Sequence, residues 1–266
     1  MEILSFKVSG KFAHFRKYYA NNTAFSFSIP PRTSLMGMVA AVMGLPRDSY
    51  YEMLSSDNIR FGIRVLSPLK KSFHRLNLLS IKSLGDMAKK WSSDFRGEGG
   101  RIQTPFEVIS GWDIRKDEVS YQVFIASTDE GMSAFGKIKD DFLTRQPVFN
   151  ITLGTANFSA AVSDICMLSG SIIEEKDLDD YHLIHSALPS EHIEDLQFSK
   201  EDFESYNFVE EDMMPGDFVA NNNREVRSMN RVIFSVTPNP LRVKLRMPFY
   251  RVSHRNDNIN IQFMDA

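Results

Sequence analysis

The sequence predicts an α+β protein whose first part is a ferredoxin-like domain. Strand and helix patterns follow one another in the order strand, helix, strand, strand, helix, strand, which is the βαββαβ arrangement. A stretch at about 70–103 separates the two central strands and is too long for an ordinary connection, so we expect a protruding, thumb-like insertion there. From residue 169 the chain becomes acidic and then strand-like. We therefore expect a ferredoxin-like domain over 1–168 and a smaller β-rich part over 169–266.

Periodicity assigns each element of the first part. Residues Glu2–Val8 alternate apolar and polar side chains, as does Ile59–Leu66, and both predict strands. Thr33 is expected to cap a helix over 34–43 that ends at Gly44. Further along the chain, a strand is predicted over 119–126, a helix over 132–142, and strands over 148–153, 157–167, 232–236, 241–245 and 259–263.

Charge is strongly segregated along the chain. Residues 1–120 hold 18 Lys and Arg against 11 Asp and Glu, residues 121–220 hold 5 against 20, and residues 221–266 hold 8 against 3. A basic N-terminal part predicts contact with a polyanion, whereas the acidic segment 174–217 is expected to be exposed to protein partners or water. The single cysteine, Cys166, and the absence of a secretory signal pattern predict a cytoplasmic protein.

The stretch from Phe12 to Gly44 combines aromatic and basic residues with a Pro-Pro turn into an apolar helix. Lysine and arginine suit phosphates and aromatic rings suit base stacking, so this stretch is a candidate site for an RNA backbone. Small residues recur on the helix at Gly37, Ala41 and Gly44. They permit close approach by a neighbouring strand or by a bound chain.

Two chemical interpretations of the same residues stay open. His14, Lys17 and Tyr18 have the groups needed for metal-independent RNA cleavage, in which His or Tyr takes the 2′-OH proton and Lys stabilises the phosphorane. The same groups serve binding equally well, and binding is the hypothesis we favour. No metal or cofactor is expected: His182, His185 and His192 share no cysteine and no HExxH pattern, which favours ordinary surface histidines.

The N-terminal stretch resembles the signature of the CRISPR-associated fifth Cas family, the RAMP-superfamily subunit of type I Cascade complexes. The resemblance rests on a strand ending in Gly10, the Ala13–Arg16 segment, the turn Pro30–Thr33, and the helix glycines Gly37 and Gly44. Two looser matches are the run 101–107 and the segment 147–154. The matching residues cover about the first 165 positions, and the acidic tail has no counterpart.

The resemblance implies an RNA-binding subunit that grips the 5′ handle of CRISPR RNA and caps the filament of backbone subunits. It also implies contact with the large subunit and, as a further expected partner, with target DNA near the protospacer-adjacent motif. The nearest branch is type I-B, which implies a non-catalytic subunit, whereas the type I-C branch would make His14, Lys17 and Tyr18 catalytic. A pure scaffold is the third hypothesis. The expected RNA-binding residues are His14, Phe15, Arg16, Lys17, Tyr18, Arg32, Thr33, Ser34 and Gly37. The expected contacts of the insertion with RNA or a neighbouring subunit are Lys70, Lys71, Lys89, Lys90, Trp91, Arg96, Arg101 and Gln103.

Overall fold

The computed structural model describes residues 1–20, 23–79, 101–173, 178, 180–198, 208–220, 223–254 and 257–265. It is a mixed α+β structure, mostly strand, which confirms the predicted class. None of the helices in these ranges is long and apolar enough to span a bilayer.

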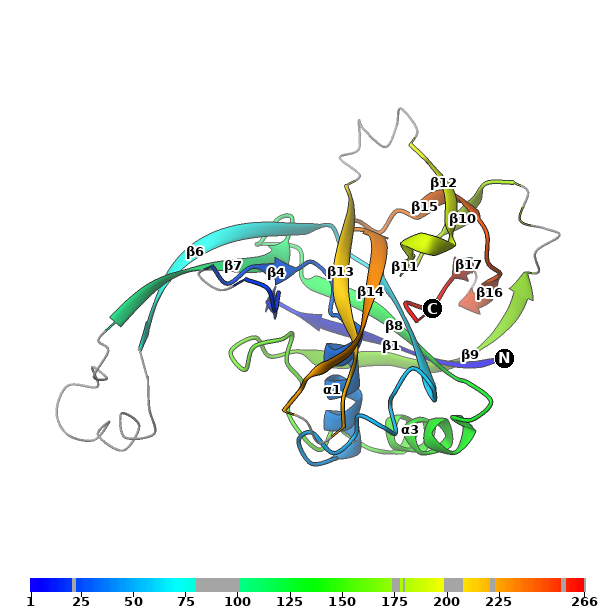
Figure 1. The fold of residues 1–266 in the computed structure, drawn as a ribbon, viewed down its shortest axis with the longest axis horizontal. Helices are drawn as coiled ribbons and strands as arrows, with labels where there is room; N and C mark the ends of the chain where they lie inside the picture. The colour runs from blue at the N-terminus through cyan, green and yellow to red at the C-terminus, as the bar shows by residue number, and fades with distance from the viewer. Residues whose placement is uncertain are drawn as a thin grey trace.

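A six-stranded antiparallel sheet forms the centre of the molecule (Figure 1). Its order is β17-β16-β9-β1-β8-β5, in which β1 pairs with both β8 and β9. The strands are β1 (Glu2–Gly10), β5 (Ile59–Val65), β8 (Val119–Ser127), β9 (Ala161–Ile173), β16 (Phe249–His254) and β17 (Asp257–Ile261). Helices α1 (Arg32–Met43) and α3 (Met132–Thr144) contact each other and contribute apolar side chains to one core with Leu4, Phe6 and Val8 of β1.

Helix α1 differs from its prediction at one end. It begins at Arg32, with Pro31 at the N-cap position and no side-chain cap, so the expected cap at Thr33 is wrong. Proline suits this position because its backbone has no N–H to leave unpaired. The helix ends as predicted at Gly44, whose φ of 72° is the left-handed conformation that glycine adopts readily.

The segment 148–153, predicted as a strand, is a loop. The backbone N–H of Phe149 donates to the carbonyl of Ala41 at 3.0 Å, so the loop is tied to the end of α1 and not to the sheet. A single bridge joins Thr152 to Ser159, and the strand that follows, β9, starts at residue 161.

The predicted insertion contains a long antiparallel hairpin that arches away from the sheet (Figure 1). Its strands are β6 (Leu69–Leu79) and β7 (Arg101–Gly111), paired from Leu69 with Gly111 to Leu79 with Arg101. The short strand β2 (Phe12–Ala13) pairs with the other edge of β7, and Ala24 bridges to Phe106 on the same edge. The N-terminal loop therefore lies along the base of this hairpin.

The C-terminal strands pack back onto the first part of the chain. One small sheet contains β10 (His182–Ile184), β15 (Leu241–Leu245) and β12 (Ile193–Gln197), and another contains β11 (Leu188–Pro189), β14 (Val226–Ser235) and β13 (Val209–Phe218). A 3-10 turn, η3, covers Ser190–His192. Strands β13 and β14 cross over α1 (Figure 1), and Met214 and Phe234 join the main core. The predicted strands at 232–236, 241–245 and 259–263 correspond to β14, β15 and β17, with shifted ends for the first and last.

Candidate nucleic-acid interface

The loop from His14 to Ser28 is held in place by hydrogen bonds from both sides. Strand β3 (Phe15–Arg16) pairs with β4 (Ser26–Phe27), and the N–H of Phe15 donates to the Ser26 hydroxyl at 2.9 Å. The buried carboxylate of Glu107 on β7 accepts from the N–H of Ser26 at 2.7 Å. This anchoring fixes which side chains of the loop face inward and which face solvent.

His14 faces inward. Its ring is 2% exposed and stacks on Phe106 with 4.0 Å between centroids. Burial lowers the pKa of His14, so the ring is neutral at pH 7, and Nδ1 then donates to the carbonyl of Glu107 at 2.7 Å. In this conformation His14 does not reach a phosphate or a 2′-OH, contrary to both of its predicted roles.

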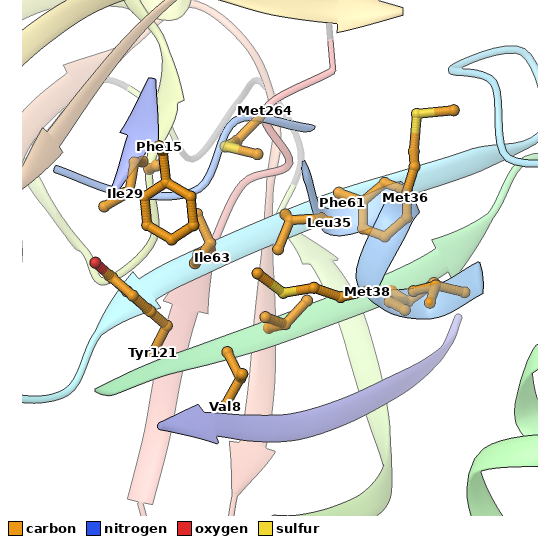
Figure 2. Packing of buried hydrophobic residues seen from close by; sticks show 14 of the residues in the cluster. Val8, Phe15, Ile29, Leu35, Met36, Met38, Phe61, Ile63, Tyr121 and Met264 are labelled. Atoms are coloured by element: carbon orange, nitrogen blue, oxygen red, sulfur yellow. The ribbon is translucent and has the colours of Figure 1, made fainter. Parts of the chain in front are cut away.

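Phe15 is also a core residue and not the predicted stacking platform. Its ring is 2% exposed and lies with Ile29 and Ile63 (Figure 2). The Tyr121 ring approaches it edge-on at 6.2 Å, while the Tyr121 hydroxyl donates to the carbonyl of Ser28 at 2.6 Å. Phe15 therefore fixes the loop to the hydrophobic core.

Arg32, expected to bind phosphate, lies in a buried ion cluster. Its side chain is 1% exposed and pairs with Asp217, at 2.5 Å, and with Asp265. Nη2 also donates to the carbonyls of Leu54, at 2.8 Å, and Ile59, at 2.6 Å. Two carboxylates and two carbonyls fill its donor positions, so we withdraw Arg32 from the candidate interface. No pattern near Arg32 signals these partners, because they come from distant parts of the chain.

Lysines 17 and 71 are paired with carboxylates of β13. The Lys17 ammonium contacts both oxygens of Asp212, at 2.7 and 2.8 Å, and Lys71 contacts Glu210 at 3.1 Å. Burial is the largest single influence on Lys17 and acts to lower its pKa, but the hydrogen bonds to Asp212 and Tyr19 together with their charges outweigh it, so the pKa is raised. This end of the acidic segment therefore contacts the chain's own loop, whereas it was expected to face partners or water.

Exposed aromatic and arginine side chains of the loop and the hairpin form a set that we call the outer strip: Arg16, Tyr18, Phe25, Phe73 and Arg75. The rings of Phe25 and Phe73 meet edge-on at 5.7 Å. The N–H of Lys17 donates to the carbonyl of Phe25, and Arg16 pairs with Ser26 on the neighbouring strand. Tyr18 is 56% exposed. Sequence reasoning missed Phe25, Phe73 and Arg75, although alternation along β6 places Phe73 and Arg75 on one face.

The remaining predicted residues fall in three places. Thr33, Ser34 and Gly37 line a pocket of about 340 Å³ beside α1. On the hairpin, Lys70 is exposed with its ammonium 6.0 Å from the Trp112 ring, and Gln103 is exposed. Arg101 begins β7, but its side chain is not described. Four residues lie outside the described residues: Lys89, Lys90, Trp91 and Arg96.

The three histidines considered as metal ligands have different neighbours. The His182 ring packs against Phe249 in a tilted arrangement with 4.8 Å between centroids. The N–H of Asn260 donates to His185 Nδ1, and His192 Nδ1 lies 3.2 Å from the Gln262 side-chain oxygen. In the described part of the chain, no three His, Cys, Asp or Glu side chains are placed to hold a metal ion.

Comparison with known proteins gives one family. The model of the family described as CRISPR-associated protein (Cas_Cas5) matches residues 3–237. No curated protein matches the chain. Among solved structures, the crystal structure of a CRISPR protein from Archaeoglobus fulgidus is similar, with a TM-score of 0.52, 14% sequence identity and 98% of each chain covered. A chain of a CRISPR RNA-guided surveillance complex has a TM-score of 0.46 and 14% identity, over 91% of this chain and 92% of that one. The first similarity indicates a shared fold.

Proposed function

The chain belongs to the CRISPR-associated protein (Cas_Cas5) family, and from that premise we propose that it is a non-catalytic RNA-binding subunit of a type I-B-like Cascade complex. It grips the 5′ handle of CRISPR RNA and caps the filament of backbone subunits. Its other partners are the large subunit and, through the complex, target DNA beside the protospacer-adjacent motif. The observation that carries the RNA-binding role is the outer strip, where exposed aromatic rings and arginines occur together on the loop and on β6.

The strip has the composition expected of a single-stranded RNA site. Arginines supply charge for phosphates, and exposed rings supply faces on which bases stack. Its position also suits the role, because Arg16 and Tyr18 come from the anchored loop and Phe73 and Arg75 from β6. A strand of RNA lying along the hairpin would contact the side chains of the loop and those of β6 together.

The topology supports the same interpretation. A ferredoxin-like core is part of this proposal. The four neighbouring strands β9-β1-β8-β5 support it, because α1 follows β1 and α3 follows β8 along the chain, and the β6–β7 hairpin lies between β5 and β8 in sequence as a thumb would.

The endoribonuclease hypothesis is the alternative. It needs His14 or Tyr18 beside a 2′-OH with Lys17 beside the phosphate. His14 is buried against Phe106, and the Lys17 ammonium is occupied by Asp212, while Tyr18 points to solvent. Cleavage would require the loop to rearrange around all three, which favours the non-catalytic proposal.

A salt titration tests RNA binding. Single-stranded RNA carrying the repeat sequence should bind with a steep negative dependence of affinity on salt. Arg16→Ala should weaken binding several-fold and reduce the slope by about 0.7, the value for one phosphate contact on a single strand. Arg246→Ala, which removes an exposed arginine outside the strip, is the matched control. Equal binding by wild type, Arg16→Ala and Arg246→Ala would refute the assignment.

A cleavage assay tests the non-catalytic role. Repeat hairpin RNA incubated with the purified protein in EDTA should stay intact. Clean cleavage that disappears in His14→Ala would establish the endoribonuclease instead. A protein that retains no RNA when purified with its partner subunits would indicate a scaffold.

A further inference from the structure

The pocket beside α1 has a floor made by small residues. Gly37 and Ala41 lie one helical turn apart on α1, and both line it. A methyl group added at Gly37 would meet only the Tyr50 hydroxyl, at 3.4 Å, within 4 Å of it. The small-residue positions noted in the sequence therefore leave space beside the helix, and the volume of about 340 Å³ is at the lower end of the range for small-molecule sites.

The walls of the pocket combine aromatic rings with neutral polar groups. Tyr50 lies edge-on to Tyr51 at 5.0 Å, and Tyr51 lies edge-on to Phe218 of β13 at 5.2 Å. Asn150 and Thr152, which also line the pocket, come from the loop tied to the end of α1. An aromatic ring together with an amide can hold an unstacked nucleobase by its face and its edge.

Arg224 is the charged residue among the described residues that line the pocket. Its Nε donates to Asp48 at 2.9 Å, and the Tyr51 hydroxyl donates to the same carboxylate. Asp48 therefore offsets part of the Arg224 charge, although no carboxylate is itself among the described lining residues.

The pocket adjoins the loop that carries the outer strip. Gly154 lines the pocket, and a side chain there would collide with the carbonyl of His14. Its φ of 94° permits this close approach, which glycine alone makes without strain. The backbone of the loop that carries Arg16 and Tyr18 therefore packs directly against a residue that lines the pocket.

We propose that this pocket receives a single nucleotide of the bound RNA, with its base between Tyr50 and Asn150 and its phosphate toward Arg224. The proposal rests on the proposed RNA-binding function and adds to it a fixed, sequence-reading position. A base held in this way is recognised by the hydrogen bonds of its edge. Substitution of that one nucleotide should therefore lower RNA affinity more than substitution of a nucleotide bound on the outer strip.

The test places 2-aminopurine at each position of the repeat-derived single strand in turn. With wild-type protein, one position should change fluorescence strongly on binding. Gly37→Leu fills the pocket and replaces a poor helix former, so it should fold, yet it should abolish that change and weaken binding about tenfold. Gly136→Leu, the same substitution on α3 outside the pocket, where an added Cβ meets no atom within 4 Å, should bind within about twofold of wild type. Tyr50→Leu provides a second route to the same loss.

The outcomes separate the two proposals. If Gly37→Leu and Tyr50→Leu bind every labelled RNA as wild type does while Arg16→Ala weakens binding, the pocket assignment is overturned and the RNA-binding function stands. If wild-type protein binds none of the RNAs, the function itself is overturned.

Discussion

Two arginines of the same N-terminal motif occupy opposite environments. Arg16 is exposed and makes a long contact of 3.4 Å from its guanidinium to the carbonyl of Ala20. Arg32, at the start of the motif's helix, is 1% exposed and meets two carboxylates and two backbone carbonyls. A phosphate can approach the first without displacing protein groups, whereas the second is already fully paired. Whether a cation in a motif binds a ligand thus depends on partners that the motif does not contain.

The largest effect expected from this comparison is on stability. Arg32→Ala leaves Asp217 and Asp265 buried without their cation, and we expect the free energy of unfolding to fall by about 3–5 kcal/mol, as for other broken buried pairs. Arg16→Ala should change the free energy of unfolding by less than about 0.5 kcal/mol, because it is an exposed residue. Urea denaturation followed by circular dichroism measures both.

The reverse pattern would contradict the comparison. If Arg32→Ala unfolds at the same urea concentration as wild type but loses RNA affinity, then the ion cluster opens in solution and Arg32 belongs to the interface after all.

Much of the fold was predictable because its elements carry local signals. The strand at 119–126 and the helix at 132–142 were found nearly to their ends, since their apolar periodicity matches the burial that the sheet imposes. The strand at 148–153 was wrong because its apolar residues serve a loop fastened to α1 by backbone hydrogen bonds, which no periodicity records. Strand β16 was missed for a related reason: its place beside β9 is set by distant pairing.

The sequence identified an aromatic and basic loop but not which of its side chains reach solvent. Arg16 and Tyr18 are exposed on this loop, and its role in RNA binding stays a prediction. Composition could not show that Phe15 is buried while Tyr18, three positions later, is exposed. The burial of Phe15 depends on contacts with distant residues: Glu107 accepts from the N–H of Ser26, and the Tyr121 ring packs against Phe15. A pattern of residues shows what chemistry a loop can offer, and the anchoring contacts decide which part of it reaches solvent.

Two aromatic substitutions test the difference between exposed Tyr18 and buried Phe15, with a smaller expected change in free energy than Arg32→Ala. Tyr18→Ala should weaken binding of repeat-derived single-stranded RNA by about 1–3 kcal/mol, the usual range for one stacked base, and leave stability unchanged. Phe15→Leu should lower the melting temperature and leave the RNA affinity of the folded protein near that of wild type. Fluorescence anisotropy and thermal melting separate the two effects. If Phe15→Leu loses RNA affinity and Tyr18→Ala does not, then Phe15 contacts RNA and Tyr18 does not, which contradicts the prediction.

The smallest expected effect is the pH dependence that the buried side of the loop creates. Burial lowers the pKa of His14 below its usual value of 6.5, so between the two pKa values the unfolded chain binds a proton that the folded protein does not. Stability is therefore complete above about pH 6.5 and falls as the pH drops below it, by at most about 1.4 kcal/mol per pH unit from this residue. His185 has a lowered pKa for the same reason and adds to the slope.

Two histidine variants separate the contributions to that slope. His14→Gln, whose amide can still donate to the Glu107 carbonyl, should lose the His14 share of the slope between pH 7 and 5 in urea denaturation, while His185→Gln loses the other share. If His14→Gln leaves the slope of unfolding free energy against pH unchanged, the His14 ring is accessible to protons in the folded state. His14 would then be a candidate for RNA contact again.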